Sequence, residues 1–163
     1  MSDTAALNLS PSGLTAFKTT AEDFVQLDGL VTTRHRLECR SCAGKRFELF
    51  EVHAKEFGAV EIDATCRQCA MSLPIFQATR DGYDGRLGHM RHLEQVSARR
   101  SDRPLCGDVL LICEVSYSID LPELASIAAE EEVPVQDLFD WFKVWVSDDA
   151  TEGWRCVWEY ECA

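Results

Sequence analysis

The sequence has no long apolar run that could cross a membrane. Its longest aliphatic stretch near the middle, VLLI at residues 109–112, is far too short to span a bilayer. Asp3 stands where a signal peptide would carry basic residues, and no apolar segment follows it. We therefore expect a soluble, cytoplasmic protein that does not associate with membranes.

Basic residues are scarce in the last third of the chain. The net charge is −12 over 163 residues. Residues 1–103 contain 14 basic and 14 acidic side chains, whereas residues 104–163 contain 2 basic and 14 acidic ones. An acidic surface repels nucleic-acid phosphate and attracts basic partners. A role in solubility alone accounts for the same charge equally well.

Eight cysteines are present, and four of them form two Cys-x-x-Cys pairs. The pairs are Cys39 with Cys42 and Cys66 with Cys69, and residues 43–65 separate them. Two cysteines three positions apart in a tight turn place their thiolates about 4 Å apart, as a tetrahedral zinc ion requires. A hairpin between the pairs would unite all four thiolates and leave no open ligand position. The sequence therefore predicts a structural Zn²⁺ site rather than a catalytic one.

Two other uses of these cysteines are weaker. A thioredoxin-type dithiol needs its Cys-x-x-Cys at the start of a helix in a βαβ unit, and neither pair has that setting. A framework of disulfides would suit a secreted chain, and the sequence carries no secretion signal. The remaining cysteines lie among apolar residues and are expected to be buried as small hydrophobic side chains.

Residues 36–77 resemble a zinc ribbon, in which two knuckles at strand ends are joined by a β-hairpin. Strand-like segments at residues 47–52 and 60–64 lie between the two cysteine pairs, and Gly44 follows the first pair closely. The second pair is followed by Ala70, where such a knuckle often has glycine. The resemblance implies a zinc site with four cysteine ligands. It implies no particular function, because zinc ribbons occur in transcription factors, enzymes, chaperones and adaptors.

The whole sequence predicts an α+β protein. A strand is expected at residues 109–119, a helix at 121–131 capped by Asp120, a second helix at 135–146 and a final strand at 154–162. The zinc-ribbon hairpin and this strand–helix–helix–strand unit would be its two parts. The expected organisation is an N-terminal segment (1–35), the zinc ribbon (36–77), a connection (78–104) and an acidic α+β unit (105–163).

The acidic last third suggests a non-catalytic, zinc-binding protein-interaction module with a basic protein partner. An inhibitor or immunity-type protein that neutralises a basic toxin would fit this charge pattern. Aromatic residues near the C-terminus are explained most simply as core, but exposed rings beside carboxylates would form binding hot spots. The residues assigned to partner binding are Trp141, Trp145, Asp137 and Asp140.

Two alternatives remain open. A nucleic-acid-associated regulator would use the basic residues of the zinc ribbon, namely Arg36, Arg40, Lys45, Arg46 and Arg67. An enzyme with a structural zinc is the other, although we find no Ser-His-Asp set, phosphate-binding glycine loop or nucleotide fingerprint. The sequence favours a protein that is not an enzyme. It leaves open the role of His89 and His92, which are three positions apart.

Overall fold

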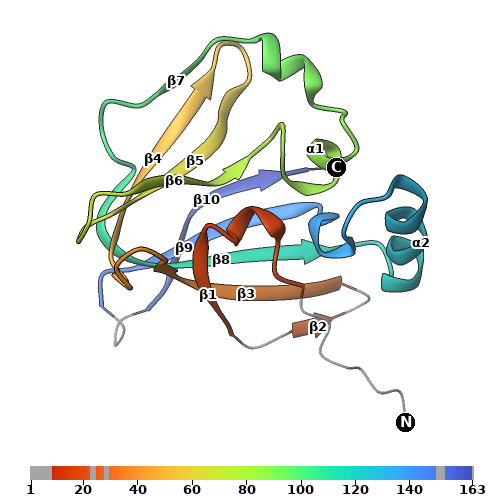
Figure 1. Ribbon diagram of the computed structural model, residues 1–163, viewed down its shortest axis with the longest axis horizontal. Helices are drawn as coiled ribbons and strands as arrows, with labels where there is room; N and C mark the ends of the chain where they lie inside the picture. The colour runs from red at the N-terminus through yellow and green to blue at the C-terminus, as the bar shows by residue number, and fades with distance from the viewer. Residues whose placement is uncertain (1–8, 23–24, 28–29, 150–152, 163) are drawn as a thin grey trace.

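The computed structural model describes residues 9–22, 25–27, 30–149 and 153–162, and within them antiparallel β-strands predominate (Figure 1). The strands are β1 (Phe17–Ala21), β2 (Val25–Leu27), β3 (Leu30–Cys39), β4 (Phe47–Ala54), β5 (Gly58–Cys66), β6 (Ser72–Gln77), β7 (Ala98–Arg100), β8 (Cys106–Tyr117), β9 (Trp141–Ser147) and β10 (Arg155–Glu161). The helices are α1 (Gly82–Arg86), α2 (Leu121–Glu131) and the 3-10 helices η1 (Ser12–Leu14), η2 (Arg91–Gln95) and η3 (Val135–Asp137). No helix in these ranges is long and apolar enough to cross a membrane.

Strand β8 organises the sheet because three other strands pair with it. Its first residues pair with β4 (Val109 opposite Phe47), and its second half pairs with β3 (Ile112 opposite Arg36). Strand β9 lies along its other edge and continues to β10. Strands β3 and β4 therefore pair with successive lengths of β8. The turn of residues 40–46 carries the chain from one to the other.

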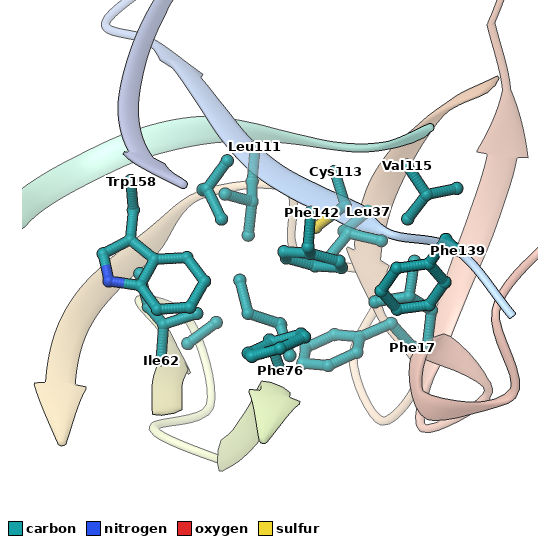
Figure 2. Packing of buried hydrophobic residues seen from close by; sticks show 14 of the residues in the cluster. Phe17, Leu37, Ile62, Phe76, Leu111, Cys113, Val115, Phe139, Phe142 and Trp158 are labelled. Carbon is teal, nitrogen blue, oxygen red and sulfur yellow. The ribbon is translucent and has the colours of Figure 1, made fainter. Parts of the chain in front are cut away.

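The sheet curls into a half-barrel whose inner face is the hydrophobic core (Figure 2). Phe76 of β6 lies at its centre, with ring centroids 4.9 Å from Phe142 of β9 and 5.4 Å from Trp158 of β10. Ile62 and Leu111 face the same space from β5 and β8. Burial alternates along β5, as a strand with one wet face requires. Strands from distant parts of the sequence thus share one core.

The prediction of an α+β protein with a strand–helix–helix–strand unit is wrong. The expected strand at 109–119 and the helix at 121–131 correspond to β8 and α2, and Asp120 accepts the Glu123 amide at 2.8 Å as an N-cap. The second predicted helix, at 135–146, is instead η3 followed by β9. Residues 155–161 form the final strand, β10.

The error at residues 141–147 has a physical cause. Trp141, Lys143 and Trp145 face outward, while the intervening side chains enter the core (Phe142, Val144 and Val146). Because large aromatic rings lie on both faces, the segment looks apolar at helical spacing as well as at strand spacing. Aromatic and β-branched residues prefer strands, and pairing with the long edge of β8 decided between the two.

The four-part division of the chain stays a prediction. Strands from all four of its parts hydrogen-bond in one sheet: β3 spans the first boundary, β4 to β6 come from the ribbon segment, β7 comes from the connection, and β8 to β10 come from the last third. The buried cluster likewise contains side chains from all four. The zinc-ribbon segment is therefore built into the sheet rather than appended to it.

Candidate metal centre

The first cysteine of each pair lies at the end of a sheet strand. Cys39 is the last residue of β3 and Cys66 is the last residue of β5. Strand β4 starts at Phe47, which lies opposite Cys66 in the β4–β5 ladder. Because β4 follows the first cysteine pair and its first residue pairs with the last residue of β5, the end of β5 lies beside the first pair. Sheet pairing, rather than the metal alone, places the two turns together.

The two turns have the same hydrogen-bond pattern. In the first, the Cys39 amide donates to the Gly44 carbonyl and the Ala43 amide donates back to the Cys39 carbonyl, both at 2.8 Å. In the second, the corresponding bonds join Cys66 with Met71 at 2.8 Å and Ala70 with Cys66 at 2.9 Å. Ala43 and Ala70 both adopt left-handed backbone, with φ of 60° and 62°. The unusual alanine noted for the second turn therefore has a counterpart in the first.

Four sulfur atoms meet where these turns adjoin. The Sγ atoms of Cys39, Cys42, Cys66 and Cys69 all lie within 4.8 Å of one another. Cys39 Sγ is 3.5 Å from Cys69 Sγ, and Cys42 Sγ is 3.5 Å from Cys66 Sγ. Tetrahedral coordination with metal–sulfur bonds of about 2.3 Å needs sulfur separations of about 3.8 Å. The group could therefore hold a metal ion, and all four cysteines are free thiols rather than disulfides.

Gly44 is required for the approach of the backbone to this sulfur group. Its amide points at Cys42 Sγ at 3.4 Å. A Cβ at position 44 would lie 2.9 Å from Cys66 Sγ and 3.2 Å from Cys42 Sγ, both closer than ordinary contacts. Any other residue would push the first turn away from the second pair.

Protonation of the thiols is unequal in the absence of a cation. Burial opposes ionisation of Cys39, but hydrogen bonds from the Cys42 and Ser41 amides outweigh it and lower its pKa to about 7. The Gly44 amide favours the Cys42 thiolate, yet desolvation and the neighbouring thiols raise its pKa to about 12. Four thiolates cannot share this space without a compensating positive charge. A bound dication would supply that charge and release the remaining protons.

The local setting of the cysteine pairs differs from that of a thioredoxin-type dithiol. Both pairs follow strands, and neither opens a helix as a thioredoxin-type dithiol would. Cys39 and Cys66 are buried, whereas Cys69 is exposed. Four ligands from the chain complete a tetrahedral shell, so a bound ion would have no open position for a substrate.

The structure separates the residues that were assigned to partner binding, which are Trp141, Trp145, Asp137 and Asp140. Asp137 is only 2% exposed and accepts from Arg86 Nη2 at 2.5 Å. Asp140 is 8% exposed and accepts a hydrogen bond from the Ser118 hydroxyl. The two carboxylates are internal anchors and do not lie on a contact surface. The two tryptophans are half-buried on the outer face of β9, where Arg34 lies over the Trp145 ring at 5.6 Å.

Most of the basic residues that the nucleic-acid alternative requires already form ion pairs or hydrogen bonds within the protein. Three of them are ion-paired at 3.0 to 3.5 Å, in the pairs Arg36–Glu22, Arg46–Asp108 and Arg67–Glu48. Arg40 donates from Nε to the Thr15 carbonyl and from Nη2 to the Phe17 carbonyl, both at 3.1 Å. Among the described residues, Lys45 is the one member of this set with neither an ion pair nor a side-chain hydrogen bond. The ribbon segment therefore presents no free arginine row to a phosphate backbone.

The two histidines of residues 89 and 92 do not form a second metal site. His89 Nδ1 lies 3.0 Å from the Asp84 carboxylate, and the His92 ring packs on Phe57 at 5.5 Å. Within the described ranges the four cysteines are the one group with metal-ligand geometry.

Sequence reasoning missed an acidic surface on α2. The helix and its flanks carry Asp120, Glu123, Glu130, Glu131 and Glu132, all exposed. Residues 118–142 contain no lysine or arginine, which is the sequence signal that identifies them. The residues that the sequence predicts for partner binding lie in the segment that follows α2.

Comparison with protein families, with curated proteins and with solved structures finds no match to this chain. What the chain does must therefore be inferred from the metal-binding group and from the surfaces that surround it.

Proposed function

We propose that the protein is a non-catalytic binding module, stabilised by a structural zinc ion, that recognises a basic protein through the acidic surface of α2. An inhibitor or immunity-type protein acting on a basic toxin is one form of this proposal. Zinc is favoured over other metals because a set of four closely spaced cysteine thiolates matches its ligand preference. The closed ligand shell supports a structural rather than a catalytic ion.

The observation that carries the partner assignment is the placement of Glu130, Glu131 and Glu132. They lie at the C-terminal end of α2, where the helix dipole is negative and basic residues are favoured. Glu132 also adopts left-handed backbone, with φ of 56°, at a position that normally takes glycine or asparagine. Three glutamates at this end therefore lower the stability of the folded protein. A binding function would explain why they are present.

Nothing within the described residues neutralises these side chains. In the part of the chain that the structure describes, no ion pair involves the carboxylates of α2, whereas acidic side chains elsewhere pair with arginine. The buried face of the helix, Leu124 and Ala128, holds it against the rest of the molecule. Trp141 begins β9 and lies opposite Ser116, near the end of β8 from which the chain enters α2.

The nucleic-acid alternative has less support. Three of its five basic residues are paired with carboxylates, and Arg40 is held by backbone carbonyls. Binding of a nucleic-acid backbone by the three paired residues would first have to break their ion pairs, and the net charge of −12 would oppose it.

The proposal is tested by affinity purification from native cells at several salt concentrations with two matched variants. One replaces Glu130, Glu131 and Glu132 by glutamine. The control replaces exposed acidic groups elsewhere with the same change in net charge, using E56Q, E94Q and D102N. We expect a basic protein to co-purify with the wild type and the control but not with the α2 variant.

A second measurement separates binding from folding. The α2 variant should be at least as stable as the wild type, because it removes charges that oppose the helix dipole. Equal recovery of the partner with both variants would refute the proposal that the partner binds to the acidic surface of α2. Co-purified nucleic acid in place of a protein would favour the alternative.

A further inference from the structure

A hollow of about 410 Å³ lies between η1, β1 and η3. Its lining is mainly polar and includes Ser10, Ser12, Thr19, His35, Arg40 and Gln136. Among the described residues, no aspartate or glutamate lines it, although the chain carries 28 acidic residues and only 16 lysines and arginines. In so acidic a protein, a polar hollow whose described lining has an arginine and no carboxylate is suited to an anion.

Several hydrogen-bond donors in the hollow have no partner in the protein. Across the described residues, the side chains of Ser10, Ser12, Thr19 and Gln136 make no hydrogen bond. These residues come from different elements, and backbone hydrogen bonds fix the positions of Ser12, Thr19 and Gln136. The Gln136 carbonyl, for example, accepts the hydroxyl of the fully buried Tyr117 at 2.6 Å. The hollow therefore offers donors from several directions.

Arg40 is fixed at the edge of the hollow. Its Nε and Nη2 atoms donate to the carbonyls of Thr15 and Phe17 at 3.1 Å, which leaves Nη1 without a partner among the described residues. The residue lies inside the first metal-binding turn, directly after Cys39. Its backbone is therefore held by that turn, and its guanidinium is held by the segment that leads into β1. This arrangement spares a ligand most of the entropy of ordering a long side chain.

Two ionisable groups near the hollow, Asp137 and His35, do not cancel the positive charge of Arg40. The Asp137 carboxylate accepts the Ser12 amide at 2.6 Å, but it is buried and compensated by Arg86 at 2.5 Å. His35 is 3% exposed and its ring contacts the Thr33 hydroxyl at 3.1 Å. Burial lowers the pKa of His35, so the imidazole is neutral at pH 7.

We infer that this hollow binds the phosphate group of a small phosphorylated ligand, with Arg40 as its charged contact. The volume is within the range of small-molecule sites. Hydroxyl, amide and guanidinium donors around the space match a tetrahedral oxyanion with several acceptor oxygens better than a planar carboxylate with two. No residue of α2 lines the hollow, so the site does not depend on the function proposed for that helix.

The test follows the backbone amides and the Arg40 Nε–H of the zinc-loaded protein by NMR during titration with inorganic phosphate. Saturable shifts are expected at Ser12, Thr19 and Arg40. R40Q should weaken binding about ten-fold or more, because it removes a charge-assisted hydrogen bond. K18Q removes the same charge from the neighbouring outer face of β1 and should change the affinity by less than about two-fold.

A second pair of variants keeps the test independent of any disturbance of the metal-binding turn. T19V removes a donor from the hollow while preserving shape, and should weaken binding about three-fold. T20V makes the same change on the opposite face of the strand and should have no effect. Shifts that stay linear with concentration, or equal effects of R40Q and K18Q, would overturn the site. Acetate binding as tightly as phosphate would overturn the assignment of a phosphate group.

Discussion

Arg34 and Glu114 form an ion pair across β3 and β8, with Arg34 Nε 2.6 Å from Glu114 Oε2. The two residues are directly opposite each other in the strand register. The Glu114 side chain is 7% exposed and that of Arg34 is 46% exposed. Glu114 also lies opposite Lys143, which in turn lies opposite Glu159. Charges of alternating sign therefore run across four strands on the outer face of the sheet.

Because the two partners differ in burial, their removal should have unequal effects. R34A leaves a buried carboxylate with less compensation and should lower the free energy of unfolding by about 2 kcal/mol. E114Q keeps a hydrogen-bond acceptor beside Arg34, and water can solvate the arginine. This substitution should lower the free energy of unfolding by about 1 kcal/mol or less. Urea unfolding of both variants measures the difference. Equal losses would show that Glu114 is solvated in spite of its burial.

Loss of one metal ligand should destabilise the whole sheet, because the four cysteines join the end of β3 to the end of β5. C42S should abolish stoichiometric zinc binding and lower the free energy of unfolding by about 4 kcal/mol or more. Metal analysis and thermal unfolding of the purified protein provide the measurements. C156S, which changes an exposed cysteine outside the group, is the control and should retain one zinc ion per chain. Iron instead of zinc in the native protein would contradict the proposed metal.

The two alanines in left-handed backbone should each be improved by glycine. At φ near 60° a Cβ is strained, whereas glycine adopts this conformation freely. A43G and A70G should therefore raise stability by up to about 1 kcal/mol, with the relief of strain partly offset by the greater freedom of the unfolded chain. A64G, in the buried β5 strand, should be destabilising instead. Destabilisation by A43G and A70G would mean that the alanine methyl groups pack against the ligand turns.

Glu61 on β5 should make stability fall as pH rises. Burial, followed by repulsion from Asp63, raises its pKa from 4.5 to about 7. Between these values the folded protein keeps a proton that the unfolded chain has released, so folding becomes less favourable as pH rises from about 4.5 to 7.

E61Q should remove this dependence and stabilise the protein at pH 8 by about 1 kcal/mol, after allowance for solvent screening at a half-buried group. D63N should lower the pKa of Glu61 measured by NMR titration. An unchanged slope of stability against pH in E61Q would assign the effect to another group.

Local sequence was a good guide where the interactions are local. Helix α2 was predictable because its cap, Asp120, and its cap partner, Glu123, are three residues apart. The strand at 141–147 was not, because its conformation depends on an edge provided by β8, about thirty residues earlier in the chain. The same reason explains Asp137 and Asp140. Their carboxylates look exposed in an acidic stretch, and only the packed structure supplies the partners that hold them.

The sequence by itself identified the four cysteines as a candidate metal-binding group, because the distance between thiols in a Cys-x-x-Cys turn is a local property. It also determined where the acidic charge lies along the chain. Only the tertiary structure decided that the two turns meet, because that requires β3 and β4 both to pair with β8. It also decided that Arg40 faces a hollow made by η1, β1 and η3. Contacts between segments about a hundred residues apart depend on sheet register and core packing, which no local pattern encodes.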